Sequence, residues 1–147
     1  MNPVFRGTPV LVFSSTLDST TESIEGGAQS VERFAQDAGF GESDRYFICM
    51  AVREILTNAI KHGNRFDKSK KVGLRLSADG SDLTIEVTDQ GDGFQLENVP
   101  DPLLPENREL TSGRGITIAR AFMDDFSVER KPEGGTQVRM VKRLPPR

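Results

Sequence analysis

The sequence predicts a two-layer α/β sandwich in which helices cover one face of a mostly antiparallel, mixed sheet. Short runs alternate apolar and polar residues, so each strand buries one side only, whereas strands covered on both faces read as continuous apolar runs. Other stretches carry apolar residues at helical spacing and are expected to cover the buried side. With 147 residues the chain has room for one core, so we expect a single domain over residues 1–147.

The N-terminal part is expected to hold an arm, a strand and a helix. Residues 1–9 contain two prolines and a glycine and predict an irregular arm, and residues 10–13 form a short β-type run. Apolar residues at helical spacing over 24–38, behind a cluster of Ser and Thr, predict the first helix. Gly39 is predicted to be the C-terminal cap of this helix.

A second helix is expected to follow. Ser43 or Asp44 can cap its N-terminus, and it should reach about Lys61, with Gly63-Asn64 as its stop. Residues 47–60 are apolar nearly all round, which is typical of a buried helix.

The middle of the chain predicts a β-hairpin and then a long loop. Apolar and polar residues alternate over 72–76 and again over 83–87, and Asp79-Gly80 forms the hairpin turn. The segment from Gly93 to Ser112 holds three prolines, too many for a helix. It is also longer than the roughly 12 to 15 residues usual for a loop without a role, so we expect it to be functional or disordered.

The C-terminal part predicts a third helix and two final strands. The helix opens at Gly115 and ends before Phe126, with its apolar residues on one face. Alternation over 126–128 and 138–140, on either side of a turn at 132–135, predicts the strands.

Composition excludes several classes of function. With 19 Lys and Arg against 22 Asp and Glu, the net charge of -3 argues against binding nucleic acid by bulk charge. No apolar stretch reaches the ~20 residues of a membrane span and no signal peptide is recognisable, so we expect a cytoplasmic protein that does not bind membranes. A lone Cys49 and a lone His62 exclude an internal disulfide and a Cys/His metal cage. Any metal must therefore be held by oxygen ligands or arrive with a ligand.

The second helix carries the first candidate site residues. Glu54, Asn58 and His62 fall four residues apart and are predicted to line one stripe of an otherwise apolar surface. A carboxamide oxygen is a hard ligand for Mg²⁺, and a carboxylate one turn away can orient or deprotonate a nucleophile. The alternatives are a solvated edge, with Glu54 capping its neighbours, and a hydrogen-bonded structural histidine at His62.

Glycine-containing motifs supply the other candidates. Asp89-Gln90-Gly91-Asp92-Gly93 stands where a strand ends, where a carboxylate can accept a hydrogen bond from an exocyclic amine such as that of adenine. Ser112-Gly113-Arg114-Gly115 opens a helix whose N–H groups can cradle phosphate. Gly134-Gly135-Thr136 enters the last strand. Taken singly, each motif also fits a plain turn or helix start.

Taken in order, these motifs resemble the nucleotide-binding boxes of the GHKL ATPase superfamily, which has the Bergerat fold. The match spans Glu54 to Thr136 and treats the long loop, at about 94–114, as an ATP lid. Within the superfamily, Asn58-Ala59 followed by His62-Gly63, the short lid, and the run at 121–125 look most like the anti-sigma factor serine/threonine-protein kinases. The resemblance implies one histidine-kinase-like ATPase domain.

The resemblance also implies roles for the site residues. Asn58 would coordinate the Mg²⁺ that bridges the ATP phosphates, and Glu54 would be the catalytic base or orient the nucleophile. Asp89 would bind the adenine amino group, and Thr136 would support that contact through its hydroxyl. The remaining nucleotide-binding positions are glycines that leave space for the base and backbone amides that reach the phosphates as the lid closes: Gly91, Gly93, Gly113, Arg114 and Gly115.

One position departs from the family pattern. Some relatives place an arginine directly before the Ser-Gly of the phosphate box, where this chain has Thr111, so the γ-phosphate contact must come from Arg114, Arg108 or elsewhere. Other kinase classes are excluded. The chain has neither a P-loop motif nor the H-R-D and D-F-G elements, and its one histidine lies inside the nucleotide motif rather than on a phosphoacceptor helix.

By this resemblance the chain is expected to be an ATP-dependent anti-sigma factor. It would bind a sigma factor and act as a kinase on a serine of a STAS-type anti-sigma factor antagonist, with ATP and Mg²⁺ as cofactors and a homodimer as the assembly. An alternative is a nucleotide-gated binding module that sequesters its partner without phosphoryl transfer. Thr111, in place of the arginine of some relatives, keeps this alternative open. A third is a structural fold that binds no nucleotide.

Overall fold

The computed structural model describes residues 10–91 and 114–145, and its elements follow the predicted order. The strands are β1 (Leu11–Asp18), β2 (Lys71–Ala78), β3 (Asp82–Thr88), β4 (Asp125–Arg130) and β5 (Thr136–Arg143). The helices are α1 (Thr21–Ala38), α2 (Glu42–Thr57), a π-helical turn η2 (Asn58–Gly63) and α3 (Arg114–Phe122).

The strands form one sheet in the order β1-β2-β3-β5-β4. Every neighbouring pair is antiparallel, so within the described ranges the sheet is antiparallel throughout rather than mixed. This agrees with strands that bury one face only. β3 and β5 are neighbours, with Thr88 opposite Gln137. The end of β3 therefore meets the beginning of β5.

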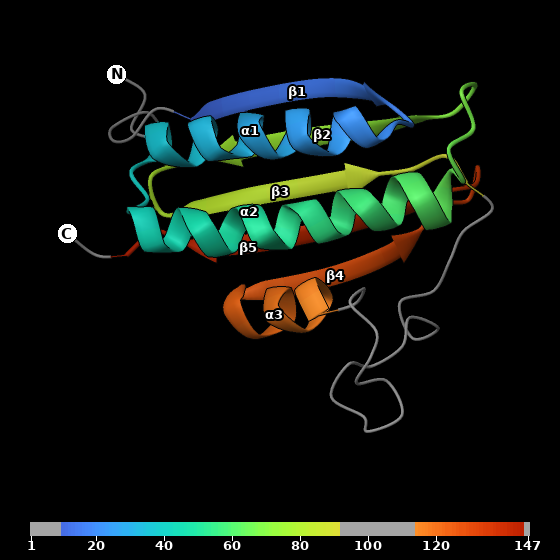
Figure 1. Ribbon diagram of the computed structural model, residues 1–147. Coiled ribbons are helices and arrows are strands. Elements are labelled where there is room, and N and C mark those ends of the chain that lie inside the picture. The colour runs from blue at the N-terminus through green and yellow to red at the C-terminus, as the bar shows by residue number, and fades with distance from the viewer. Residues whose placement is uncertain (1–9, 92–113, 146–147) are drawn as a thin grey trace, which may run out of the picture.

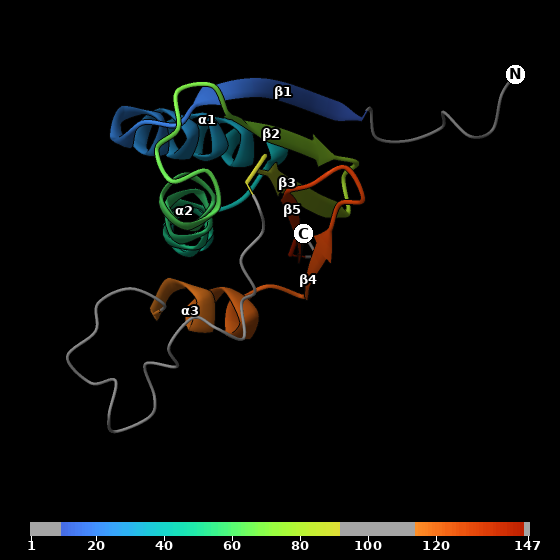
Figure 2. The ribbon, with the colours of Figure 1, turned by 90° about the vertical axis from the view of Figure 1, so that its right-hand side faces the viewer.

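The helices lie on one face of the sheet, which confirms the predicted two-layer sandwich (Figure 1, Figure 2). α1 lies along β1 and β2, α2 runs along the middle of the sheet, and α3 lies beside β4 (Figure 1). Aliphatic side chains fill the space between the layers, and burial of each stabilises the fold by about 1.5–3 kcal/mol. The largest fully buried ones include Ile48, Ile55, Leu56, Ile60, Leu74, Leu76, Leu83, Ile85 and Met140.

β1 is longer than the predicted strand at 10–13. It continues through the hydroxyl residues 14–16 to Asp18, and these pair with β2 in unbroken register. The alternation of more and less buried residues continues into this half of the strand, where Leu17 lies opposite Val72 and packs against the core. The sequence pattern missed this half of the strand because serine and threonine give no apolar signal.

α1 ends where the sequence predicts, and it begins at Thr21, within the Ser/Thr cluster that precedes the predicted apolar pattern. The Thr20 hydroxyl accepts a hydrogen bond from the Ser23 N–H (3.3 Å), which caps the N-terminus. At the C-terminus Gly39 has a φ of 106°, and its N–H donates to the Gln36 carbonyl (3.0 Å). The predicted Gly39 cap is confirmed, and its left-handed backbone explains why glycine stands there.

The N-terminus of α2 is not capped as predicted. Gly41 is the N-cap and no side chain bonds to the helix start, so Ser43 and Asp44 lie inside the first turn instead. Asp44 still favours the helix, because a negative charge in the first turn interacts well with the helix dipole.

α2 is also less buried than its apolar sequence predicts. Tyr46 is 62% exposed and Phe47 is 36% exposed, whereas most apolar residues of the helix from Ile48 onward are buried. The ring of Phe47 lies 5.4 Å from that of Phe122 in α3, so this aromatic residue joins two helices near the surface.

The remaining elements agree with the predictions. Asp79 closes the β2–β3 turn, since its Oδ1 accepts the N–H groups of Ser81 and Asp82 (2.9 Å each). Helix α3 begins at Arg114, one position before the predicted Gly115. Strands β4 and β5 contain the predicted alternating residues.

Candidate functional site

α2 continues into the π-helical turn η2, which the sequence pattern did not predict. Its wider hydrogen bonding is seen where the Asn64 N–H donates to the Ala59 carbonyl (2.8 Å). In a continuous α-helix Gly63 would point about 140° away from Asn58, because each residue turns by about 100°. A turn that holds more residues brings Gly63 round towards the side of Asn58.

The chain leaves η2 through two residues with left-handed backbone. Arg65 and Phe66 have φ of 54° and 57°, a conformation that costs a non-glycine residue about 1–2 kcal/mol. The Phe66 N–H donates to the Ile60 carbonyl (2.9 Å), which holds this reversal closed. The predicted helix stop at Gly63-Asn64 is confirmed, and the backbone strain that follows it is of the kind that clusters at binding sites.

Asp89 follows directly after β3 and is buried, with only 3% of its surface exposed. Its Oδ1 accepts hydrogen bonds from the N–H groups of Gly91 (3.0 Å) and Thr136 (3.1 Å). The Asp89 N–H in turn donates to the Thr136 carbonyl (2.9 Å). Burial raises the pKa of Asp89, and the two backbone hydrogen bonds to its carboxylate partly oppose that rise.

Glycines surround Asp89 because a side chain would not fit beside it. A Cβ at Gly63 would meet the Asp89 carboxylate, 2.7 Å from its Cγ. A Cβ at Gly91 would run into the Gly63 carbonyl, and one at Gly135 would run into the Asp89 carbonyl. Gly135 also has a φ of +95°, which favours glycine. The end of η2, the turn after β3 and the entry to β5 are therefore packed backbone to backbone around Asp89.

Two buried polar atoms in this region have no hydrogen-bond partner within residues 10–91 and 114–145: Asn58 Nδ2 and Thr136 Oγ1. A buried polar group without a partner costs about 1–3 kcal/mol. Such groups call for a partner beyond the residues described, such as a ligand. The Asn58 carboxamide also carries an oxygen, which is the kind of ligand that Mg²⁺ prefers. These residues therefore fit a nucleotide carried with Mg²⁺.

The structure gathers some of the predicted site residues and separates others. Asp89, Gly91 and Thr136 are in direct contact, and Asn58 lies on the turn whose last residue contacts Asp89. Burial varies along the predicted stripe of the second helix: Asn58 is buried, Glu54 is half-buried and His62 is exposed. Gly63, rather than His62, packs against Asp89.

Other predicted positions lie outside the described residues. These are Gly93, Gly113 and the part of the predicted lid (about 94–114) that precedes Arg114. The backbone of Arg114 and Gly115 forms the first turn of α3, as expected for a helix N-terminus that follows a glycine-rich box. Their contacts with phosphate stay a prediction.

Two buried polar residues beside Asp89 were missed. Asn64 is 1% exposed and Ser19 is 4% exposed, and both are hydrogen-bonded. The sequence offered only a weak signal, since an asparagine after glycine indicates a helix stop and Ser19 lies in a Ser/Thr cluster. Their position beside the turn at Asp89–Gly91 becomes evident only in the fold.

The one cysteine, Cys49, is buried in the fold. Burial and a hydrogen bond to Glu32 raise the pKa of the Cys49 thiol to about 11, so it stays protonated at neutral pH and is a poor nucleophile. Within the two described ranges, no group of three or more His, Cys, Asp or Glu side chains could hold a metal ion. None of the helices described is both long and apolar enough to span a bilayer.

Comparison with known proteins places these residues in context. Residues 17–142 match the histidine kinase-like ATPase domain family. An anti-sigma F factor of Thermoanaerobacter sp. (strain X514) is 33% identical over 143 residues, 96% of this chain and 85% of the relative. An anti-sigma F factor of Clostridium acetobutylicum is 33% identical over 145 residues, 97% of this chain and 86% of the relative.

A solved structure shares the fold. The RsbU and RsbW domains of a Mycobacterium tuberculosis protein match with a TM-score of 0.65 at 21% sequence identity. The match covers 93% of this chain and 32% of that longer chain. At this identity the likeness shows a common architecture.

Proposed function

This chain belongs to the histidine kinase-like ATPase domain family and is a relative of the anti-sigma F factors, and on that premise we propose that it is an ATP-dependent anti-sigma factor. In this proposal it binds a sigma factor and phosphorylates a serine of an antagonist protein of the STAS type, working as a homodimer. The names of relatives that are similar over nearly the whole chain support the choice of partners.

The buried Asp89 is the observation that carries the proposal. Both backbone bonds to its carboxylate use Oδ1, whereas Oδ2 lies against Gly63 and accepts neither of these bonds. We propose that Oδ2 accepts a hydrogen bond from the exocyclic amine of adenine. The Thr136 hydroxyl, which lacks a partner among the residues described, would supply a further bond at the base. A purine with an amino group is the ligand that this set of acceptors and donors suits best.

Phosphoryl transfer is assigned to residues of α2 and η2. Asn58 would hold Mg²⁺ through its amide oxygen, and the ion, when bound, would neutralise charge on the phosphate oxygens. Glu54, one helical turn earlier, would accept the proton of the attacking serine hydroxyl. The serine oxygen bonds to the γ-phosphorus, the bond from that phosphorus to the ADP oxygen breaks, and the proton passes to the Glu54 carboxylate. Backbone N–H groups at the start of α3 would help to hold the phosphates.

Transfer of label from γ-labelled ATP to the antagonist protein tests this proposal. We expect Asn58→Ala to abolish Mg²⁺-dependent transfer. Glu54→Gln should still bind nucleotide but transfer phosphate at least about 100-fold more slowly, because proton transfer contributes that much in comparable enzymes. Glu22→Gln, which changes an exposed carboxylate of α1, is the matched control and should transfer at the unmodified rate.

Two outcomes would count against the proposal. Normal transfer by a folded Glu54→Gln protein would remove Glu54 from the mechanism. Absence of any ADP or ATP binding in the presence of Mg²⁺ would overturn the nucleotide-dependent function as a whole.

One feature of the sequence favours a second function. Thr111 stands where some relatives of the resembled family have an arginine next to the phosphate box. A chain without that contact would use nucleotide to gate its hold on the partner, without phosphoryl transfer. Partner exchange driven by ATP, with no label on the antagonist, would favour this nucleotide-gated module.

A further inference from the structure

A hydrogen-bond network beside Asp89 connects the ends of β1 and η2 with the start of β2 and the turn Asp89–Gly91. We propose that Asn64 is a positioning residue for this turn, and that Ser19 holds Asn64 in place. The inference deepens the proposed function, because it rests on Asp89 binding adenine. Its consequence is that base selectivity depends on a residue that does not touch the nucleotide.

The Asn64 carboxamide uses its oxygen and its nitrogen in different directions. Its Oδ1 accepts the Gln90 N–H (2.8 Å), and its Nδ2 donates to Ser19 Oγ (3.0 Å) and to the Lys71 carbonyl (3.0 Å). The Ser19 hydroxyl donates onward to the Lys70 carbonyl (2.6 Å). Because Asn64 is only 1% exposed, water cannot replace these bonds readily.

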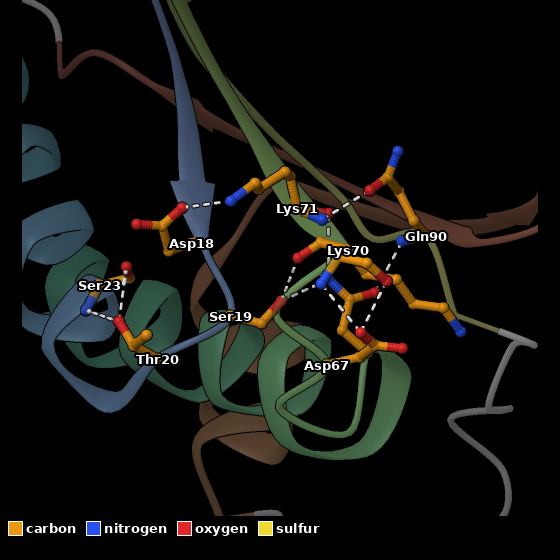
Figure 3. Close-up of polar contacts among 10 residues, drawn as sticks. Asp18, Ser19, Thr20, Ser23, Asp67, Lys70, Lys71 and Gln90 are labelled. Atoms are coloured by element: carbon orange, nitrogen blue, oxygen red, sulfur yellow. Dashed lines mark hydrogen bonds and ion pairs between the residues drawn. The ribbon is translucent and has the colours of Figure 1, made fainter.

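Figure 3 shows this region, where β1 ends and β2 begins. The Gln90 side chain lies over Lys71 and accepts its backbone N–H, so the turn is anchored through side chain as well as backbone (Figure 3). The Lys71 ammonium is directed elsewhere, to Asp18 of β1 (2.6 Å). The contacts around Gln90 are therefore made by neutral groups whose geometry is directional.

The bond from Gln90 to Asn64 acts on Asp89 through a single rigid unit. The Gln90 N–H belongs to the planar peptide that joins Asp89 to Gln90, so fixing this N–H fixes the orientation of that peptide. On the other side, the Asp89 N–H is held by the Thr136 carbonyl (2.9 Å). Asp89 is thus clamped on both sides, and Asn64 provides the clamp that is not part of the sheet.

Asparagine is the side chain that suits this position. It carries one acceptor and two donor hydrogens at the length that reaches Gln90, Ser19 and Lys71. Aspartate would keep the acceptor and lose both donors, and leucine would keep the volume and lose all three bonds. These two substitutions separate the bond to Gln90 from the bonds that hold Asn64.

Selectivity between ADP and inosine diphosphate tests the proposal, because the inosine base lacks the amino group. With Mg²⁺ present, we expect the unmodified protein to prefer ADP, and Asn64→Leu to reduce the ratio of the two dissociation constants about tenfold. Asn64→Asp should fall between them, and Ser19→Ala should reduce the ratio about threefold. Ser69→Ala is the matched control, since it removes an exposed hydrogen bond to Asp67 from the same loop (2.7 Å) and should leave the ratio unchanged.

Amide hydrogen exchange without nucleotide supplies a second readout. We expect the Gln90 amide to exchange at least tenfold faster in Asn64→Leu, while the Ile85 amide in the middle of β3 keeps its protection. A purely structural role would instead speed exchange across the sheet. An unchanged selectivity ratio in folded Asn64→Leu would overturn the proposal.

The outcomes are distinguishable from failure of the proposed function. If the unmodified protein binds neither diphosphate, nucleotide binding itself is wrong. If it binds ADP selectively and the Asn64 variants do so equally well, only the positioning role is wrong. Should Asn64→Leu not fold, Ser19→Ala decides, and an unchanged ratio in that variant overturns the proposal.

Discussion

The two ends of β3 each carry an aspartate whose Oδ1 accepts two backbone N–H bonds, yet their surroundings differ. Asp79 lies in the exposed turn before β3, and its hydrogen bonds to the backbone lower its pKa. Asp89 follows β3 in the interior, and burial raises its pKa despite an equal number of backbone bonds. Two backbone hydrogen bonds to one carboxylate oxygen therefore accompany opposite pKa shifts at the two ends of one strand.

The comparison shows that hydrogen-bond count alone does not identify a site residue. At Asp79 the bonds stabilise a charge that water also stabilises, so the residue serves the turn. At Asp89 the charge is held away from water, which lowers the stability of the fold unless a ligand interacts with it. A buried carboxylate surrounded by glycines distinguishes the end of β3 at which we propose nucleotide binding.

The largest expected effect breaks the packing at the Asp89 end. Gly63→Ala would place a methyl group against the Asp89 carboxylate, and we expect the free energy of unfolding to fall by about 2–3 kcal/mol. Gly26→Ala is the matched control within a helix, because nothing lies within 4 Å of its Cβ position. It should stabilise the protein by about 0.5–1 kcal/mol. Urea unfolding measures both, and equal stabilities would contradict the close packing at Gly63.

The next effect separates the two aspartates by ligand binding. Asp89→Asn presents an amide where the adenine amine needs an acceptor, so we expect ADP binding to weaken about 10- to 100-fold, the loss typical of a charge-assisted hydrogen bond. Asp79→Asn should bind ADP as the unmodified protein does. Calorimetric titration in the presence of Mg²⁺ makes the comparison. Equal weakening in both variants would contradict a specific contact between Asp89 and the base.

A smaller effect compares two threonines beside this junction. Thr136→Val removes a buried hydroxyl that has no partner in the part of the chain described, so the nucleotide-free protein should gain up to about 1 kcal/mol. Thr88→Val removes an acceptor for the Gln137 side-chain amide (3.1 Å) and should lose about 0.5–1.5 kcal/mol. Thermal and urea unfolding report both changes. The reverse order of stabilities would contradict an unpaired hydroxyl at Thr136.

The smallest effect is the pH dependence of stability, which should have opposite signs at the two ends. Since the folded pKa of Asp89 is raised, its contribution to stability is present at low pH and is lost as pH rises through that pKa. Asp89→Asn should therefore gain on the unmodified protein near neutral pH, and the gain should vanish as pH falls towards the ordinary aspartate range.

At Asp79 the folded pKa is lowered, so its contribution is present above the ordinary range and is lost as pH falls through the lowered pKa. Asp79→Asn should be slightly less stable than the unmodified protein near neutral pH and equal to it in strong acid. The effect is small because solvent screens this exposed carboxylate. Urea unfolding across pH measures the stability of both variants. A pH dependence of the same sign in both would contradict the contrast between the buried and the exposed end.

Features set by local residue patterns could be predicted from the sequence. The Gly39 cap, the turn at Asp79-Gly80 and the alternation in β3 and β5 depend on neighbouring residues, and each appears in the structure. The pairing of Asp89 with Thr136 was accessible only through resemblance to a family. Nothing in the spacing of the residues requires two such distant positions to meet.

Features set by tertiary packing could not be predicted. The π-helical turn places Gly63 against Asp89, a tertiary contact that helical periodicity does not reveal. The hydroxyl-rich half of β1 is a strand because it pairs with β2, not because of its own composition. Asn64 is an ordinary helix-stop residue until the fold brings Gln90 to it.

The junction of Asp89 and Thr136 has a consequence for the length of the chain between them. These residues are 47 positions apart, yet main-chain bonds join them directly, so the chain between them departs from and returns to one fixed point. The entropic penalty of closing a loop grows only logarithmically, by about 0.6 kcal/mol for each doubling of its length. Changes in the length of this excursion therefore carry only a small entropic penalty, and they leave the hydrogen bonds that join Asp89 to Thr136 in place.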